Sequence, residues 1–505
     1  MSLNLATSLR ESARLHAQRI ALVFGENTWT YAALHDAVRR FAGALSDLGI
    51  ERGQHIALLL PNTPEFTIAY FGGAYAGCPV VPLNALLTAD EIAYHLDDGD
   101  AIALVTVSAL LPQAQAAASR VRACRHLIVA GAAAPPGGAL AFDRLLATAT
   151  PCTQITPTNG DDTAVLLYTS GTTGKPKGAE LTHSNLMLNA HIFRTDLLPL
   201  TADTVALCAL PLFHIFGQTG VQNAVLAAGG TVVLMPRFDA AGALALMAQH
   251  RVRYFAGVPT MYFGLLNQPD VSRYDLGALL HCVSGGAPLP LEVIRAFEAR
   301  YNVQILEGYG LSETSPAASF NTRAKRKPGS VGVPVWGCEM RLVDEGGGEI
   351  TAPLVPGEIQ IKGHNVMKGY WKNPEATAAA LQDGWFSSGD IGHRDADGHY
   401  FIVDRKKDMI IRGGFKVYPR EIEEILYGHA AVAEAAVIGI PHASHGEEVK
   451  AVIAKRPGHE ATTEQHIIDH CRLHLAPFKA PRIVEFRTSL PKGPSGKILK
   501  RELRG

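Results

Sequence analysis

The sequence predicts an α/β protein with a large N-terminal domain and a small α+β C-terminal domain. Three observations predict this fold. Apolar runs alternate with helical patterns from residue 31 to residue 256, as in parallel sheets covered by helices on both faces. After about Lys327 the segments become short, rich in β-formers and punctuated by glycine, and a charged stretch at 404–408 then precedes a mixed terminal unit. We therefore expect a domain at 1–404, with a β-rich subdomain at about 328–404, and a domain at 405–505.

The individual elements follow from local patterns. A helix is predicted after Thr30, which suits an N-cap, and it should end at Gly49. Further strands and helices are expected in the N-terminal domain at 56–60, 64–76, 80–81, from 89, and at 102–107, 164–167, 206–210, 220–228, 231–235, 240–250 and 253–256. The β-rich subdomain should contain strands at 340–343, 358–361 and 400–403.

Composition excludes several classes of protein. The 505 residues include 46 basic and 47 acidic side chains, so no overall charge attracts nucleic acid or anionic lipid. Hydrophobic residues make up 47% of the chain, which excludes a disordered protein. The N-terminus lacks a basic stretch followed by an apolar run, and no apolar run reaches about 18 residues, so we expect a soluble, cytoplasmic protein. The seven cysteines contain no C-x-x-C pair, which argues against a cysteine zinc site or a disulfide framework.

A glycine- and hydroxyl-rich loop follows the apolar run 164–167. Residues 168–178 read Tyr-Thr-Ser-Gly-Thr-Thr-Gly-Lys-Pro-Lys-Gly. Glycines allow close backbone approach, hydroxyls donate to phosphate oxygens and lysines add charge, so the segment suits a polyphosphate. It is not a Walker A loop, because Lys175 is followed by Pro176. The alternative is an ordinary solvated turn.

This loop resembles a loop of the adenylate-forming superfamily, in particular of its acyl-CoA synthetase branch. Further motifs of that superfamily occur in this chain from Thr30 to Lys497, in the superfamily's order. The resemblance implies ATP and CoA as co-substrates, Mg²⁺ as cofactor and a mobile C-terminal domain. It assigns to ATP binding Thr169, Ser170, Gly171, Thr172, Thr173, Gly174 and Lys177.

Bringing a carboxylate to ATP sets like charges together, at a cost of about 4 kcal/mol per pair at 4 Å and an effective dielectric of about 20. The resemblance supplies the neutralising charge as Mg²⁺, held by Glu313, and as Lys177 and Lys497. Lys497 would bridge the attacking carboxylate and the α-phosphate.

Other motifs resemble the nucleotide site of the superfamily. Small residues and the Tyr309 ring would enclose adenine, while Asp390 would accept hydrogen bonds from ribose, with Arg405 beside it. The remaining residues assigned to this site are Gly286, Ala287, Glu307, Gly308 and Ser312. Tyr309 could equally be a core residue, and Asp390 a turn-capping aspartate.

The superfamily uses its C-terminal domain twice. By resemblance, rotation about a hinge at Lys407 would replace the Lys497 loop with Gly413 and Gly414, past which the pantetheine arm of CoA would run.

The acyl pocket is assigned by resemblance to His214, Gly217, Val258 and Gly308, with His214 as its gate. The segments placed in this pocket carry neither an arginine for a second carboxylate nor an acid for an amine, which favours an apolar monocarboxylate. The small residues Gly217 and Gly308 suggest room for a medium or long chain, or for a ring.

Other readings stay open. The acceptor could be a carrier-protein thiol, the acid could be aromatic, and the chain could be a kinase or a nucleotide-binding regulatory protein. A homodimer is also possible. His466, His470 and His474 would share one helix face after the capping box at 462–465, which suits a solvated face better than a zinc site.

Overall fold

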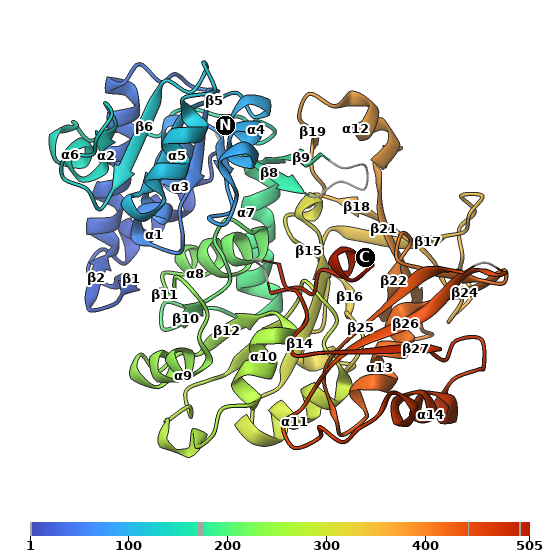
Figure 1. Ribbon diagram of the computed structural model, residues 1–505. Helices are drawn as coiled ribbons and strands as arrows, with labels where there is room; N and C mark the ends of the chain where they lie inside the picture. The colour runs from blue at the N-terminus through green and yellow to red at the C-terminus, as the bar shows by residue number, and fades with distance from the viewer. Residues whose placement is uncertain (1–2, 170–174, 443, 494–495, 505) are drawn as a thin grey trace.

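Figure 1 shows a computed structural model of the chain, which describes residues 3–169, 175–442, 444–493 and 496–504. One large sheet has the strand order β19-β9-β8-β4-β3-β5-β6-β7, with antiparallel pairing only at β8-β9 and β9-β19. Its strands are β3 (His55–Leu59), β4 (Val80–Pro82), β5 (Ala101–Val107), β6 (His126–Ala130), β7 (Leu140–Ala141), β8 (Thr163–Thr169), β9 (Lys177–Thr182) and β19 (Gly369–Tyr370). Thr169 and Lys177 are register partners, so the two ends of the glycine-rich loop lie side by side.

A second large sheet has the order β16-β15-β14-β13-β12-β10-β11-β1-β2. Its strands are β1 (Ile20–Phe24), β2 (Asn27–Thr30), β10 (Val205–Cys208), β11 (Thr231–Leu234), β12 (Tyr254–Gly257), β13 (His281–Ser284), β14 (Ile305–Gly310), β15 (Ala317–Phe320) and β16 (Val333–Pro334). Parallel pairing aligns Gly257, Ser284 and Glu307. The carboxyl ends of β12, β13 and β14 therefore meet at one edge, where ligands of α/β proteins commonly bind.

Helices pack around these sheets. They are α1 (Ala6–Leu15), α2 (Tyr31–Asp47), α3 (Pro64–Ala76), α4 (Ala89–Asp98), α5 (Leu111–Ala118), α6 (Phe142–Thr148), α7 (His183–Ile192), α8 (Ala224–Ala227), α9 (Ala240–Gln249), α10 (Pro259–Leu266), α11 (Leu291–Tyr301) and α12 (Pro374–Ala380). The predicted cap is present, since the Thr30 side chain accepts a hydrogen bond from the backbone N–H of Ala33.

The helix predicted at 220–228 differs in form. A π-helix spans Phe216–Asn223 and continues directly into α8. All eight residues of the π-helix are buried, and Gly217 packs against backbone, because a Cβ there would lie 2.6 Å from the carbonyl oxygen of Pro211. Tertiary contact on every side therefore decides the helix type.

A third, wholly antiparallel sheet lies within the span predicted to be β-rich. It contains β17 (Cys338–Val343), β18 (Gly357–Gly363), β20 (Leu381–Gln382), β21 (Trp385–Arg394) and β22 (Tyr400–Arg405). Two short strands of the same span, β16 and β19, instead join the two large sheets.

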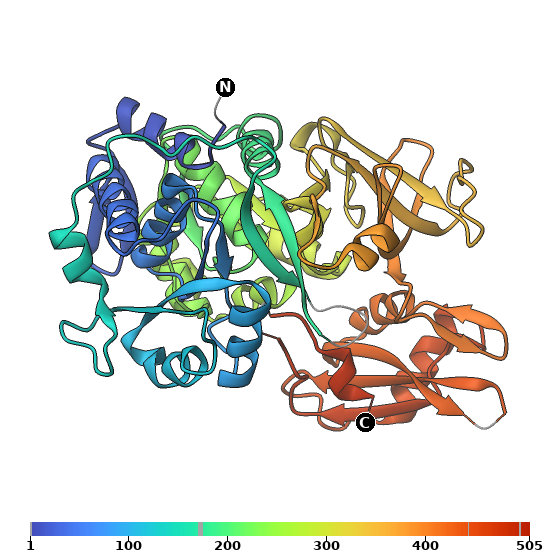
Figure 2. The ribbon, with the colours of Figure 1, turned by 90° about the horizontal axis from the view of Figure 1, so that it is seen from above.

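The C-terminal unit has a sheet and a core of its own. Its elements are β23 (Ile410–Arg412), β24 (Phe415–Val417), α13 (Pro419–Tyr427), β25 (Val432–His442), β26 (Gly446–Lys455), α14 (Glu464–His474) and β27 (Ile483–Arg487). Ile422, Val437, Ile453 and Ile467 belong to a core cluster separate from that of the N-terminal body. Figures 1 and 2 show this unit in orange-red to red, with the segment after β27 running back toward the green elements. Among the described residues, no helix combines the length and apolarity needed to cross a bilayer.

Candidate active site

A large cleft between the N-terminal body and the C-terminal unit brings together most of the predicted site residues. Those that line it are Thr169, Lys177, His214, Val258, Gly286, Ala287, Glu307, Gly308, Tyr309, Ser312, Glu313, Asp390, Arg405, Lys407 and Lys497. They come from segments more than 300 residues apart in the chain.

Some predicted residues lie elsewhere. Gly217 does not line the cleft and packs against backbone. Gly413 and Gly414 form the turn between β23 and β24 and also lie outside the cleft lining. The assignments to Ser170, Gly171, Thr172, Thr173 and Gly174 fall outside the described residues.

Glu313 lines the cleft beside Thr169, the residue at which β8 ends. Its Oε1 accepts hydrogen bonds from Oγ1 of Thr169 at 3.2 Å and from the hydroxyl of Tyr370 at 2.9 Å. The Nζ of Lys177 lies 5.3 Å from the centre of the Tyr370 ring. Within the described ranges no hydrogen bond reaches Oε2 of Glu313, so this oxygen is available to a ligand.

Tyr370 is a residue that sequence reasoning missed. It lies on the two-residue strand β19, which pairs with β9 across more than 180 residues of chain. A strand of two residues carries no periodic signal, so only the sheet pairing places this hydroxyl on Glu313.

Tyr309 and Asp390 contact each other directly. The Tyr309 hydroxyl donates to Oδ2 of Asp390 at 2.7 Å, and Nε of Arg405 lies 3.4 Å from Oδ1. Asp390 and Arg405 face each other as register partners of β21 and β22. Burial raises the pKa of Asp390, whereas Arg405 and the Tyr309 hydrogen bond act in the opposite direction. The carboxylate therefore has one strong donor and one adjacent cation in a buried setting.

Lys497 enters the cleft from the C-terminal unit. The carbonyl oxygen of the preceding residue, Gly496, accepts a hydrogen bond from Oγ1 of Thr260 at 3.2 Å. A Cβ on Gly286 would lie 3.7 Å from Nζ of Lys497, which locates the ammonium group at the carboxyl end of β13. Burial lowers the pKa of Lys497 to about 8, with Arg405 adding to the effect and Asp390 opposing it.

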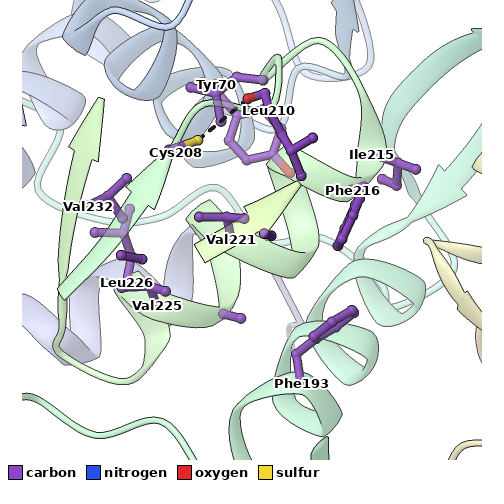
Figure 3. Packing of buried hydrophobic residues seen from close by; sticks show 14 of the residues in the cluster. Tyr70, Phe193, Cys208, Leu210, Ile215, Phe216, Val221, Val225, Leu226 and Val232 are labelled. Atoms are coloured by element: carbon purple, nitrogen blue, oxygen red, sulfur yellow. Dashed lines mark hydrogen bonds between the residues drawn. The ribbon is translucent and has the colours of Figure 1, made fainter. Parts of the chain in front are cut away.

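The wall next to His214 is apolar. Burial, and secondarily the charge of Lys497, lower the pKa of His214 to about 3, so its ring is neutral near pH 7. Phe216 and Phe193 reach toward one another from two π-helical segments (Figure 3), and Phe193 meets Phe320 edge to face with ring centres 5.9 Å apart.

Other parts of the protein pack directly against the small residues near this wall. A Cβ on Gly308 would lie 2.6 Å from Cδ2 of Phe320, and one on Gly285 would lie 3.2 Å from Cε1 of Phe216. The space that Gly308 and Gly217 suggested for substrate is thus occupied by an aromatic ring and by backbone respectively.

The histidine face of α14 has structural roles. His466 completes the capping box with Thr463, and Nε2 of His470 lies 3.0 Å from the carbonyl oxygen of Ile425. In the parts of the chain that the structure describes, the side chains grouped closely enough to hold a metal ion are instead His442, His445 and Glu448, where Nε of Arg412 already pairs with Glu448 at 2.8 Å.

Known protein families and individual proteins match nearly the whole chain. The model of the family described as "AMP-binding enzyme" matches residues 9–371, and that described as "AMP-binding enzyme C-terminal domain" matches residues 421–497. The chain is 38% identical to a long-chain-fatty-acid–CoA ligase of Bacillus subtilis, covering 99% of this chain and 94% of that protein. It is 39% identical to a feruloyl-CoA synthase of an Amycolatopsis species, covering 97% of this chain and 96% of that protein.

A solved structure of the anthranilate CoA ligase AuaEII in complex with anthranoyl-AMP superimposes with a TM-score of 0.94. That alignment has 30% identity and covers 100% of this chain and 97% of the other. Both family models, the full-length relatives and the superposition lead to one conclusion: this chain belongs to the family of AMP-binding enzymes.

Proposed function

We propose that the protein is an AMP-forming acyl-CoA synthetase that activates an apolar carboxylic acid. The observation that carries this proposal is Lys497, which the C-terminal unit inserts into a cleft of the N-terminal body beside Gly286, near Asp390 and Arg405. A cation delivered from a separate unit suits a reaction in which it is needed for one step and absent for the next.

In the first step, a carboxylate oxygen of the acid attacks the α-phosphorus of ATP and the bond to pyrophosphate breaks. Lys497 stabilises the charge that develops on the α-phosphate, Tyr309 stacks on adenine, and Asp390 with Arg405 holds the ribose. Thr169 and Lys177, at the two ends of the glycine-rich loop, bind the phosphates.

The residues around Glu313 fit Mg²⁺. A buried carboxylate with one oxygen free of hydrogen bonds from the described residues is the hard oxygen donor that this ion prefers. When bound, Mg²⁺ would neutralise phosphate charge. Glu313→Gln should raise the Mg²⁺ concentration needed for half-maximal activity, and an unchanged requirement would argue against this site.

In the second step, the CoA sulfur attacks the acyl carbon, the bond to AMP breaks, and the thiol proton passes to solvent. We propose that residues 405–505 turn about Lys407 between the steps, withdrawing Lys497 and bringing Gly413 and Gly414 to the cleft. Lys407→Pro should damage the two steps unequally, because proline restricts backbone rotation. If both steps kept the rates of the unmodified protein in Lys407→Pro, a hinge at Lys407 would be excluded.

The acid is expected to be apolar because Phe193, Phe216, Phe320 and a neutral His214 form the wall beside the reacting centre. Medium- and long-chain fatty acids are our first choice, supported by the Bacillus relative, and aromatic acids are the second, supported by the Amycolatopsis relative. Seven free cysteines and the need for ATP support a cytoplasmic location.

The deciding experiment offers ATP, Mg²⁺, CoA and a panel of straight-chain and aromatic acids, and identifies all products. We expect AMP, pyrophosphate and an acyl-CoA. Formation of ADP would indicate a kinase instead, AMP and pyrophosphate without acyl-CoA would favour a carrier-protein acceptor, and no turnover would favour a regulatory nucleotide-binding protein.

A further inference from the structure

Helix α13 turns a charged face toward the N-terminal body. Its apolar side packs into the core of the C-terminal unit through Ile422 and Leu426. The side chains of α13 that line the cleft are Arg420, Glu423, Glu424 and Tyr427. A helix that carries three charged side chains into a partly dehydrated interface requires compensating partners there.

Arg420 makes two hydrogen bonds that span the hinge. Its guanidinium donates through Nη1 to the carbonyl oxygen of Ile402, and its backbone N–H donates to Oδ2 of Asp404 at 2.9 Å. Ile402 and Asp404 belong to β22, before Lys407, whereas Arg420 follows it. A rotation at Lys407 therefore separates these partners.

Glu424 also faces the N-terminal body in this orientation. Burial raises the pKa of its carboxyl group, against the charge of Arg420 and the nearby backbone N–H of Leu291. Leu291 is the first residue of α11, so its N–H has no partner within that helix. The Glu424 carboxyl group therefore lies near the N-terminus of a helix of the opposite unit, where negative charge is favourable.

The N-terminal body adds buried acids that face Arg420. Glu307 and Asp404 are 5% and 8% exposed, and the charge of Arg420 acts on Glu307 as well as on Glu424. If Arg420 moved away, these acids would lose an adjacent cation, which is costly for buried charges.

The same helix holds the segment that follows Lys497. Nζ of Lys500 lies 2.8 Å from Oε1 of Glu423, and that oxygen also accepts the backbone N–H of Val437 at 2.8 Å. Burial alone would lower the pKa of Lys500, but Glu423 and Asp404 outweigh it and raise the pKa. Lys500 is only three residues from Lys497, so α13 links the position of the lysine loop to the N-terminal body.

We infer that Arg420 and Glu424 are positioning residues that stabilise the orientation in which Lys497 occupies the cleft, through the hinge contacts with Ile402, Asp404 and Leu291. This inference rests on the proposed two-step function. Because the hinge contacts exist in one orientation only, they shift the population of orientations toward the adenylate-forming one. Removing the side-chain contacts of Arg420 and Glu424 should slow the first step and leave the second step intact or faster, while the backbone N–H of Arg420 keeps its bond to Asp404.

The test compares Arg420→Met and Glu424→Ala with the unmodified protein in two assays. One measures single-turnover pyrophosphate release without CoA, and the other measures thioester formation from supplied acyl adenylate and CoA. We expect pyrophosphate release to slow by about tenfold or more, since small misplacement of a catalytic group has effects of this size. Thioester formation should change less than about threefold, within the scatter expected for variants outside the reacting site.

Two further variants separate positioning from general damage. Glu424→Gln keeps an oxygen acceptor near the Leu291 N–H and should restore much of the pyrophosphate release. Glu421→Ala serves as the matched control, because Glu421 lies on the same helix but pairs with Lys479 of its own unit. It should leave both assays unchanged.

A readout independent of activity uses the trypsin sites at Arg405, Lys406 and Lys407. Loss of the hinge contacts should increase cleavage there in Glu424→Ala but not in Glu421→Ala, with both proteins folded by circular dichroism. Equal losses in both half-reactions, or cleavage and pyrophosphate release unchanged from the unmodified protein, would overturn the inference. An unmodified protein that forms no adenylate would instead overturn the proposed function, while the cleavage assay would still report on the hinge contacts.

Discussion

The hydroxyl of Tyr309 donates a 2.7 Å hydrogen bond to Oδ2 of Asp390. The side chain proposed to stack on adenine therefore also orients the carboxylate proposed to bind ribose. This hydrogen bond couples the two halves of the proposed nucleoside site, although the two residues lie 81 positions apart in the chain.

Replacing Tyr309 with Phe keeps the ring and removes the hydroxyl. Asp390 would lose its strongest donor while Arg405 remains, so we expect the KM for ATP to rise by about three- to tenfold, the equivalent of one hydrogen bond. Steady-state kinetics with ATP varied would measure this. An unchanged KM would mean that Arg405 alone positions Asp390.

Lys497→Ala should all but abolish adenylate formation. We expect its rate to fall by about 10²-fold or more, because the variant loses one charge at the reacting phosphate. Thioester formation from supplied acyl adenylate should be largely spared. Lys492→Ala is a suitable control, because Lys492 precedes the same segment and pairs with Glu434. Equal loss of both half-reactions in Lys497→Ala would contradict a role in the first step alone.

The pH dependence of the first step should reflect the pKa of Lys497, which burial lowers to about 8. Below this pH the side chain is charged and active; above it, kcat/KM for ATP should fall about tenfold per pH unit, because this ratio reports groups of the free enzyme. In Lys497→Arg the decline should move to higher pH, since a guanidinium stays protonated. A decline at the same pH in this variant would assign it to another group.

Glu307 should make stability depend on pH. Burial raises the pKa of its carboxyl group from 4.5 to about 7, so the folded state binds this proton more tightly than the unfolded chain. Its contribution is fully present below about pH 4.5 and is lost as pH rises to about 7, a change of about 3 kcal/mol in the free energy of unfolding.

Glu307→Gln removes this titration and keeps an acceptor for the Gly329 N–H, which donates to Oε2 of Glu307 at 2.8 Å. Denaturant unfolding at pH 5 and pH 8 should show the variant gaining stability relative to the unmodified protein as pH rises. Glu292→Gln, at an exposed surface pair, should show no such trend. If the free energy of unfolding of Glu307→Gln changed with pH as it does in the unmodified protein, Glu307 would be excluded as the source of the pH dependence.

Much of the molecule could be predicted from local patterns. Apolar alternation predicted the α/β class, and Thr30 with Gly49 predicted the limits of α2, because capping and left-handed glycine geometry are properties of a few adjacent residues. The resemblance to the adenylate-forming superfamily likewise predicted fifteen site residues that the structure gathers at one cleft. Local patterns failed where packing decides, as in the π-helix at Phe216–Asn223 and the space beside Gly308 that Phe320 fills.

The amino-acid sequence by itself determined which chemical groups this protein possesses and in what order: a loop rich in glycine and hydroxyl groups, the acid Glu313, the carboxylate of Asp390 and, near the end of the chain, Lys497. Only the tertiary structure decided which of them meet. Tyr370 on Glu313, Tyr309 on Asp390 and Arg420 across the hinge are pairs that no residue spacing reveals. Such contacts arise when sheets and units pack together, because their partners are brought into reach by burial of distant apolar surfaces rather than by neighbouring backbone.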